Sequence, residues 1–288
     1  MTACLGASLS IGAVVLGAGA VRATPAPGVP IEDHEFRTSD GVRLHYLSAG
    51  QGEPALVVIP GWLMPARLFE RQLTGLSAGR RVVVLDPRSQ GDSELAHGSH
   101  SAERRSRDIA EFVAELSPHR FVLMGWSLGV MEGLDYVERY HPEGLAGLVL
   151  IDNSIGEARP PAASATGASK RTHRLERLRA FVRGLFAQSP PPALLSATEA
   201  SVLRVPDPVA AELLAKPYPR EYYRDALYRA DVPVMYAIRP KFAEQGDALK
   251  SRRPDAWIAL YPQAGHALFV DEAERFNRDV ESFLGPVR

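Results

Sequence analysis

Short runs of consecutive apolar residues recur along the chain, separated by more polar segments. An unbroken apolar run predicts a strand buried on both faces, because a strand with one face in water would alternate apolar and polar residues. Six runs have this character, and they span residues 55–61, 81–87, 120–125, 144–152, 231–238 and 255–262. They are the predicted strands of the fold.

Three segments between or after these runs have helical periodicity. Residues 105–116, 128–140 and 272–284 repeat their apolar side chains every three or four positions, which predicts amphipathic helices. Residues 34–50 instead contain two short strand-like stretches around a Ser-Asp-Gly turn, which predicts a hairpin. Alternating strands and helices indicate an α/β fold, with a mostly parallel central sheet flanked by helices.

The alternation breaks between Ile155 and Ala230. This insert is rich in proline, lacks strand-like runs, and contains a basic amphipathic segment over residues 170–186. It has twelve Lys and Arg residues against seven Asp and Glu residues. The excess could favour anionic substrates or a negatively charged surface. Alternatively, it is a solvated helical face whose arginine stems cover apolar surface.

Composition narrows the function classes. The chain has 288 residues, 45% of them hydrophobic and 23% charged, with a formal net charge of −1. These values are typical of a globular enzyme or binding protein and give no indication of a nucleic-acid partner. The sequence has no glycine-rich phosphate loop, no zinc-like Cys/His spacing and no internal repeat. We therefore expect neither a cofactor nor a metal ion.

The N-terminal segment differs from the rest of the chain. Residues 1–23 are small and apolar and contain a single charge, at Arg22, and a proline-rich linker follows over residues 24–31. We expect a secretory signal peptide, although it lacks a positive start, and hence a secreted or periplasmic protein. The alternatives are a membrane anchor over residues 5–21, or neither, since the apolar stretch is long for a signal. The single cysteine, Cys4, lies here, so a cleaved protein would have no thiol.

One strand-like run ends in the sequence Gly125-Trp126-Ser127-Leu128-Gly129, and a predicted helix follows at once. A strand, a tight turn with a glycine on each side of a serine, and a helix form the context of a nucleophile elbow. With this motif the chain resembles the α/β-hydrolase family from about Glu32 to its end. The resemblance implies that Ser127 is a nucleophile; the alternative is a serine that only caps a helix.

A serine hydroxyl needs a base to become a good nucleophile. His266 follows the last predicted strand and precedes the final helix, where the family has its catalytic histidine. The resemblance therefore implies that His266 takes the proton of Ser127 and later gives it to the leaving group. The other histidines lie in the hairpin, in predicted loops or in the insert.

The acid of the triad is less clear from the sequence. The family often has it just beyond the strand that follows the insert, which falls here near Phe242 and has no carboxylate. Some relatives carry the acid at the end of the preceding strand, which here is Asp152. Asp152 would keep the order serine, acid, histidine along the chain. Asp247 and Glu244 remain alternatives if the loop after Ile238 folds back.

Acyl transfer also requires donors for the developing oxyanion. The family resemblance suggests the backbone N–H groups of Leu128 and Trp62, although this chain has Pro60 where relatives often have histidine. Trp62, Leu63 and Trp126 would make an apolar pocket wall, or they are ordinary core residues. Residues 86–93 resemble a turn of the family that is structural rather than catalytic.

The resemblance divides the chain into a core, residues 32–154 and 231–288, and a helical cap, residues 155–230. It implies a serine hydrolase that cleaves small carboxylic esters through an acyl-enzyme. Lactone hydrolysis or cofactor-free perhydrolysis would use the same residues. A catalytically silent ligand-binding protein is the alternative of another class. Membrane contact would involve only the N-terminal segment or the basic cap.

Overall fold

The computed structural model describes residues 1, 29–157, 173–215 and 217–285. Within these residues, eight strands form one sheet in the order β1-β2-β4-β3-β5-β6-β7-β8. The strands are β1 (Ile31–Arg37), β2 (Arg43–Ala49), β3 (Ala55–Ile59), β4 (Val82–Asp86), β5 (Phe121–Trp126), β6 (Leu145–Ile151), β7 (Val234–Ile238) and β8 (Trp257–Leu260). The six runs predicted as strands and the predicted hairpin are confirmed.

The sheet is antiparallel at one end and parallel elsewhere. β2 pairs antiparallel with β1 and with β4, and all later pairings are parallel. In register, Ile59 of β3 lies beside Gly125 of β5, and Ile151 of β6 lies beside Ala237 of β7. The carboxyl ends of β3, β5, β6 and β7 therefore meet at one edge of the sheet, where the predicted site residues follow them.

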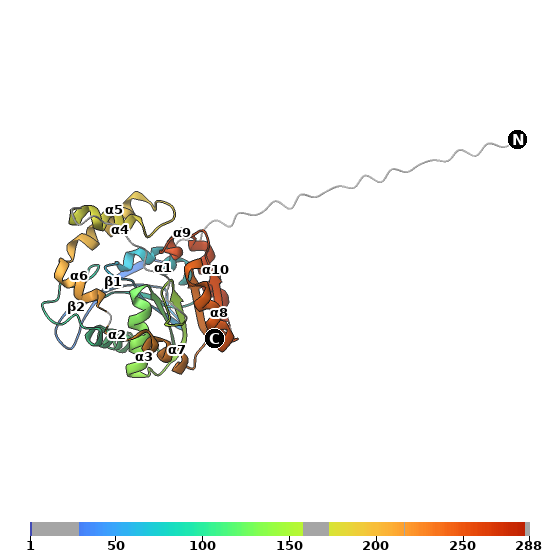
Figure 1. The fold of residues 1–288 in the computed structure, drawn as a ribbon, viewed down its shortest axis with the longest axis horizontal. Coiled ribbons are helices and arrows are strands. Elements are labelled where there is room, and N and C mark those ends of the chain that lie inside the picture. The colour runs from blue at the N-terminus through green and yellow to red at the C-terminus, as the bar shows by residue number, and fades with distance from the viewer. Residues whose placement is uncertain (2–28, 158–172, 216, 286–288) are drawn as a thin grey trace.

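Helices cover both faces of the sheet. Their bounds are α1 (Glu70–Leu76), α2 (Ala102–Leu116), α3 (Leu128–Tyr140), α4 (Arg174–Arg183), α5 (Pro192–Arg204), α6 (Asp207–Leu214), α7 (Arg220–Arg229), α8 (Ala243–Arg252), α9 (Leu268–Asp271) and α10 (Ala273–Leu284), with 3-10 turns at Ala66–Phe69 and Pro240–Phe242. Figure 1 shows α4, α5 and α6 gathered away from α2, α3 and α7. The fold is thus the α/β sandwich expected from the sequence.

Two hydrophobic cores lie on opposite faces of the sheet, as β3 illustrates. Leu56 and Val58 pack into one core with α1 and α10, whereas Val57 and Ile59 pack into the other with α2 and α3. Because both faces are covered, every residue of β3 is buried. Each such aliphatic side chain contributes about 1.5–3 kcal/mol on burial, which explains why the parallel strands are unbroken apolar runs.

The predicted helices are confirmed, with small differences at their ends. α2 begins before residue 105, because the Ser101 side chain accepts a hydrogen bond from the Arg104 N–H at 3.2 Å and caps the helix. The prediction of a loop after Ile238 is wrong, because a 3-10 turn that starts at Pro240 leads directly into α8. Proline suits the first turn of a helix because its missing N–H has no partner there.

Several sequence predictions lie partly or wholly outside the described residues. The signal peptide, Cys4 and most of the linker are among them, as are the first residues of the basic segment 170–186, which forms α4 from Arg174. Among the residues that are described, no helix combines the length and apolarity needed to cross a bilayer.

Candidate active site

Ser127 lies in a strained turn between β5 and α3. Its backbone has φ 53° and ψ −118°, a positive-φ conformation that costs energy for a residue with a side chain. Hydrogen bonds hold the turn: the Ser127 N–H donates to the Ile151 carbonyl at 3.0 Å, and the Asn153 amide donates to the Ser127 carbonyl at 2.6 Å. Such strain is typical of functional sites and projects the hydroxyl above the sheet.

The two glycines of the motif are required by close backbone packing. A Cβ on Gly125 would lie 2.4 Å from the Gly129 carbonyl oxygen, and one on Gly129 would lie 2.1 Å from the Ile59 carbonyl oxygen. Any larger residue would push α3 away from β5 or β3. The motif therefore has a physical basis in this fold.

His266 connects Ser127 with Asp152. The His266 Nε2 lies 2.9 Å from Ser127 Oγ, and its Nδ1 lies 2.6 Å from Asp152 Oδ2. The Trp126 indole N–H donates to the His266 carbonyl at 2.9 Å and fixes the loop before α9. We call Ser127, His266 and Asp152 the Ser127 array; its three members come from the ends of β5 and β6 and from the loop after β8.

Asp152 is the carboxylate that the structure brings to His266. Its side chain is fully buried at the end of β6, whereas Glu244 and Asp247 are exposed on α8. Burial alone would raise the pKa of Asp152, but hydrogen bonds from His266 and Arg239 outweigh burial and hold that pKa below its ordinary value. Asp152 is therefore ionised at neutral pH.

The pKa of His266 is also below its ordinary value. Burial is the largest cause, and the positive charges of Arg239 and Lys241 lower the pKa further, whereas Asp152 raises it. The imidazole is therefore mainly neutral at pH 7, which is the form that can accept a proton from a hydroxyl group.

The loop after β3 approaches the serine from the other side. A Cβ on Gly61 would lie only 3.0 Å from the Ser127 Cβ, so Gly61 and Trp62 lie close to the nucleophile position. Leu128 is the first residue of α3, and the first N–H groups of a helix have no acceptor within it. Trp62 and Leu128 thus both lie near Ser127, one in the loop after β3 and the other at the start of α3.

A cavity of about 350 Å³ opens over this site. Ser127 and His266 line it with Trp62, Leu128 and Trp126, and further lining residues include Met131, Asn153, Phe181 and Leu214. Leu63, expected at the pocket, is instead fully buried in the core, where its N–H donates to Gln90. Met131 and Phe181 were not singled out in the sequence, although both occupy apolar positions of amphipathic helices.

A larger neighbouring cavity of about 700 Å³ shares part of this lining. Trp62, Phe181, Leu185 and His266 line both cavities, whereas Arg239 lines only the larger one. Trp62 and Phe181 pack edge to face, with ring centroids 5.3 Å apart. This aromatic pair therefore contributes to the walls of both cavities.

The arginines of the cap are largely paired within the cap. Arg174 contacts Asp207, and both Arg179 and Arg183 contact Glu199, at 3.2 Å and 3.5 Å. These pairs neutralise part of the excess charge noted in the sequence. They favour the interpretation of α4 as a solvated face over that of an anion-attracting one.

The turn after β4 has a structural role. The Asp86 carboxylate accepts hydrogen bonds from the backbone N–H groups of Ala66 and Asp92, at 2.5 Å and 2.9 Å, and lies 2.7 Å from His45 Nδ1. His45, Asp86 and Asp92 are near enough to share a cation. Because protein donors already occupy the Asp86 oxygens, the cluster is better described as an internal support of the turn.

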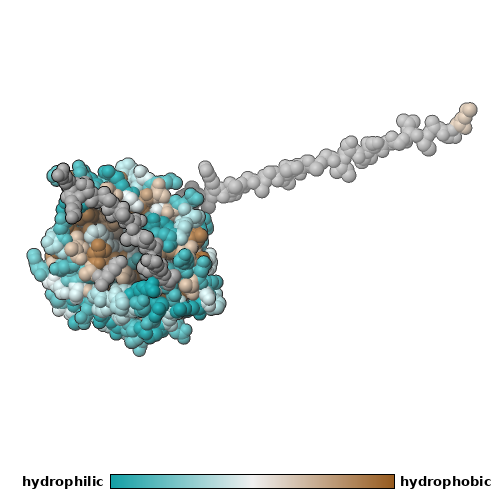
Figure 2. Space-filling view, in the orientation of Figure 1, coloured by the Kyte–Doolittle hydropathy of each residue, from teal (hydrophilic) through white to brown (hydrophobic). Residues whose placement is uncertain are grey.

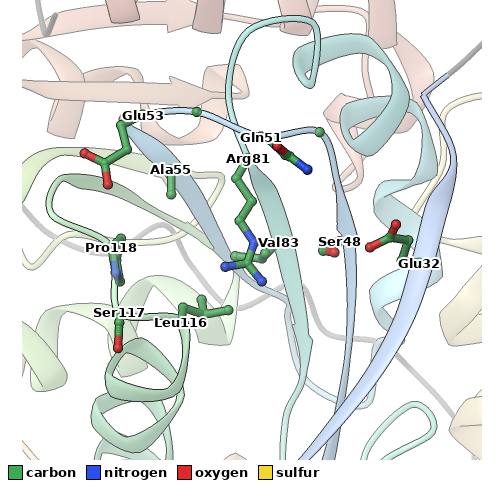
Figure 3. A pocket seen from close by; sticks show the side chains of 12 residues that line it. Glu32, Ser48, Gln51, Glu53, Ala55, Arg81, Val83, Leu116, Ser117 and Pro118 are labelled. Atoms are coloured by element: carbon green, nitrogen blue, oxygen red, sulfur yellow. The ribbon is translucent and has the colours of Figure 1, made fainter.

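A third cavity, of about 370 Å³, lies at the opposite edge of the sheet, next to Ala55 at the start of β3. Glu32, Glu53 and Arg81 are among its lining residues, and the Arg81 side chain reaches into its middle (Figure 3). Among the described residues that line it, there is neither a histidine nor a cysteine. Size alone therefore does not distinguish the candidate site; the Ser127 array does.

Comparisons with known proteins identify the family of this chain. A protein named as a non-heme haloperoxidase from Mycobacterium phage D29 is 32% identical over 120 residues, which are 41% of this chain and 42% of that relative's length. A pimeloyl-[acyl-carrier protein] methyl ester esterase from Vibrio vulnificus is 26% identical over 261 residues, 84% of this chain and 98% of that protein. A crystal structure described as an aryl esterase from Burkholderia cenocepacia has a TM-score of 0.74 and 26% identity, and the match covers 89% of this chain and 99% of that one. The model of the alpha/beta hydrolase family matches residues 56–279, and the chain belongs to that family.

Proposed function

We propose that this protein is a serine hydrolase that cleaves carboxylic esters through an acyl-enzyme intermediate. The observation that carries the proposal is the continuous contact from Ser127 Oγ to His266 Nε2, at 2.9 Å, and from His266 Nδ1 to Asp152 Oδ2, at 2.6 Å, beside an apolar cavity. This is the geometry of an activated nucleophile, its base and the acid that orients the base.

The residues have distinct roles in the proposed reaction. Ser127 Oγ attacks the ester carbonyl while His266 Nε2 accepts the hydroxyl proton, and the carbonyl oxygen becomes an oxyanion. The N–H groups of Trp62 and Leu128 stabilise that oxyanion. The C–O bond to the alcohol then breaks as His266 returns the proton to the departing oxygen, which leaves an acyl group on Ser127.

The second half of the reaction uses the same residues with water. His266 takes a proton from the water molecule, whose oxygen attacks the acyl carbonyl. The acid product leaves when the bond to Ser127 Oγ breaks, and His266 returns the proton to that oxygen, which restores the free enzyme. Asp152 remains ionised throughout; it holds the imidazole in one tautomer and stabilises the imidazolium.

The two cavities suggest how an ester would lie. The smaller cavity is lined by Ser127, Leu128 and Trp62, so we place the acyl chain there, against Met131 and Leu214. The larger cavity is lined by His266 but not by Ser127, and His266 protonates the leaving group. The alcohol part would therefore depart toward the larger cavity.

Relatives support ester chemistry and add one alternative. An aryl esterase and a methyl ester esterase are among the similar proteins, which favours esters over other substrates. The similarity to a haloperoxidase favours a second candidate, in which hydrogen peroxide replaces water and converts the acyl-enzyme into a peracid. Both reactions pass through the same acyl-Ser127 intermediate. The intact Ser127 array argues against a silent binding protein.

The test is hydrolysis of nitrophenyl esters of increasing acyl length, with wild type beside Ser127→Ala. We expect turnover by the wild type, loss of turnover in the variant, and a decline once the acyl chain exceeds the smaller cavity. Adding hydrogen peroxide then shows whether peracid forms. Activity that persists in Ser127→Ala would contradict the assignment of the nucleophile.

A further inference from the structure

The end of β7 carries cations where the family often has its acid. The sequence there is Arg239-Pro240-Lys241-Phe242, without a carboxylate. Because β6 and β7 are adjacent and parallel, this end lies beside Asp152 at the end of β6. Compared with the common pattern, the acid is on the neighbouring strand and an arginine faces it.

Arg239 binds both oxygens of Asp152. Its backbone N–H donates to Oδ1 at 3.0 Å, and its Nε and Nη2 both lie 2.7 Å from Oδ2. The same Oδ2 lies 2.6 Å from His266 Nδ1. Arg239 and His266 therefore hold the carboxylate together, and its orientation is determined by both.

The burial of Asp152 explains why a second partner is needed. The Asp152 side chain is 0% exposed, and a buried carboxylate beside a neutral imidazole alone would be poorly compensated. The planar guanidinium provides a fixed pair of donors, which a flexible ammonium group cannot reproduce. Lys241 is more distant, with Nζ 4.0 Å from Oδ2.

We propose that Arg239 is a positioning residue of the active site, which fixes the Asp152 carboxylate in the orientation that His266 Nδ1 requires. The proposal rests on the serine hydrolase function proposed above. Arg239 acts through Asp152 and contacts neither Ser127 nor the position of the reacting carbonyl.

Among the described residues, a small set of charged groups surrounds His266. Arg239 and Lys241 face it from the end of β7, and Asp152 faces it from β6. Asp271 of α9 accepts the Gly265 N–H at 2.7 Å. From the cap, Glu176 and Arg177 of α4 line the larger cavity with His266. Of these, Asp152 raises the pKa of His266, and Arg239 and Lys241 lower it.

The decisive variant is Arg239→Gln in the full chain. We expect kcat on a nitrophenyl ester to fall by roughly 10-fold to 100-fold, because a slightly misplaced imidazole loses productive geometry. Because Arg239 also lines the larger cavity, KM can change as well, so the positioning role is judged from kcat. The pKa of His266, measured by NMR titration of its imidazole signals, should rise because a nearby positive charge is lost. The acidic limb of kcat/KM should move to higher pH with it.

Two further variants separate positioning from general stability. Arg239→Lys keeps the charge but loses the paired donors, so the pKa of His266 should stay near that of the wild type while kcat is only partly restored. Arg253→Gln is the matched control, since Arg253 binds the carbonyl groups of Ala230 and Val232 ahead of β7, at 3.0 Å and 2.7 Å. It should lower stability without moving the pKa of His266.

The outcomes distinguish this inference from the proposed function. Wild-type kcat in folded Arg239→Gln would overturn the positioning role. If Arg239→Gln does not fold, wild-type kcat in Arg239→Lys would overturn it as well. If the wild type hydrolyses no ester, the proposed function fails, but the NMR titration still decides whether Arg239 controls His266.

Discussion

The Ser127 array has a counterpart elsewhere in the molecule with similar distances. Ser89 Oγ, in the turn after β4, lies 2.8 Å from His100 Nε2, and His100 Nδ1 lies 3.2 Å from Glu212 Oε2 on α6. We call these three residues the Ser89 array. Ser89 even shares the positive φ of Ser127, at 64° against 53°. The order of the hydrogen bonds and the positive sign of the serine φ are therefore the same in both regions.

The surroundings of the two serines differ. Ser89 is fully buried, and its Oγ also accepts the Ala96 N–H at 2.9 Å. Ser127 lines a cavity and lies at the start of a helix. The exposure of the two acids is the reverse of that of the serines. The Glu212 side chain is 62% exposed, whereas that of Asp152 is 0% exposed. The serine of one array lines a cavity, whereas in the other array it is the acid that is exposed to water.

The Ser89 array connects the core to the cap. Glu212 belongs to α6 of the cap, and two nearby contacts join the same parts: Arg204 of α5 donates to the Ser93 carbonyl at 2.8 Å, and the Trp62 indole donates to the Ala210 carbonyl at 2.8 Å. A serine, a histidine and an acid in contact thus do not by themselves define an active site. Access to the serine and burial of the acid do.

The largest expected effect on activity is that of Ser127→Ala, compared with Ser89→Ala as its control. Ser127→Ala should lower kcat/KM for esters by roughly 10⁴-fold or more, because no other described group can take the acyl chain. Ser89→Ala should retain most activity. A fluorophosphonate probe, read by mass spectrometry, should label the wild type and Ser89→Ala but not Ser127→Ala. Labelling at Ser89 would remove the distinction between the arrays.

The acid comes next in expected effect. Asp152→Asn should reduce kcat by roughly 10³-fold to 10⁴-fold while the protein remains folded, because the amide favours the wrong imidazole tautomer. Asp247→Asn is the control, since its side chain is exposed on α8, and it should behave like wild type. Steady-state kinetics with circular dichroism tests both. A near-normal Asp152→Asn and an inactive Asp247→Asn would reverse the assignment.

A smaller effect is expected in the pH dependence. The protonated imidazole of His266 cannot accept a proton, so kcat/KM should fall as pH drops through its pKa. Because that pKa is lowered from 6.5, the fall should begin in a more acidic range than for an ordinary histidine. A profile from pH 4 to 9 measures it, and Glu212→Gln should leave the limb in place. A limb above pH 7 would show that burial does not dominate at His266.

The smallest expected effect concerns stability. Glu212→Gln removes a carboxylate that is largely exposed, so the free energy of unfolding should fall by less than about 1 kcal/mol. Urea unfolding of this variant beside the wild type provides the measurement. A loss several times larger would mean that the Ser89 array is a principal support of the cap rather than one contact among several.

The sequence was sufficient for the parts of the site that are locally determined. Ser127 lies in a motif whose glycines are needed within a few residues of it, and His266 lies between a strand and a helix that are both recognisable. The sheet followed from unbroken apolar runs for a similar reason. Each of these features depends on neighbours along the chain.

Features of the structure that depend on contacts between distant segments could not be predicted from the sequence. The sequence leaves three candidates for the acid, Asp152, Asp247 and Glu244. The contact that holds the Asp152 carboxylate comes from Arg239, and only the pairing of β6 with β7 brings these two residues together. The loop prediction after Ile238 failed because α8 has a weak apolar pattern of its own and packs through Gln245 and Leu249. The Ser89 array joins residues more than a hundred positions apart, which no local pattern indicates.

The chain order of the site has a consequence for how such proteins can diversify. Ser127 and Asp152 both precede the cap helices, and Arg239 and His266 both follow them. Exchange of the intervening segment would alter the walls contributed by Phe181 and Leu214 and leave all four of these residues beyond the ends of their strands. Mutations in the cap segment can thus change which substrate fits, while the segments before and after it keep the residues of the Ser127 array.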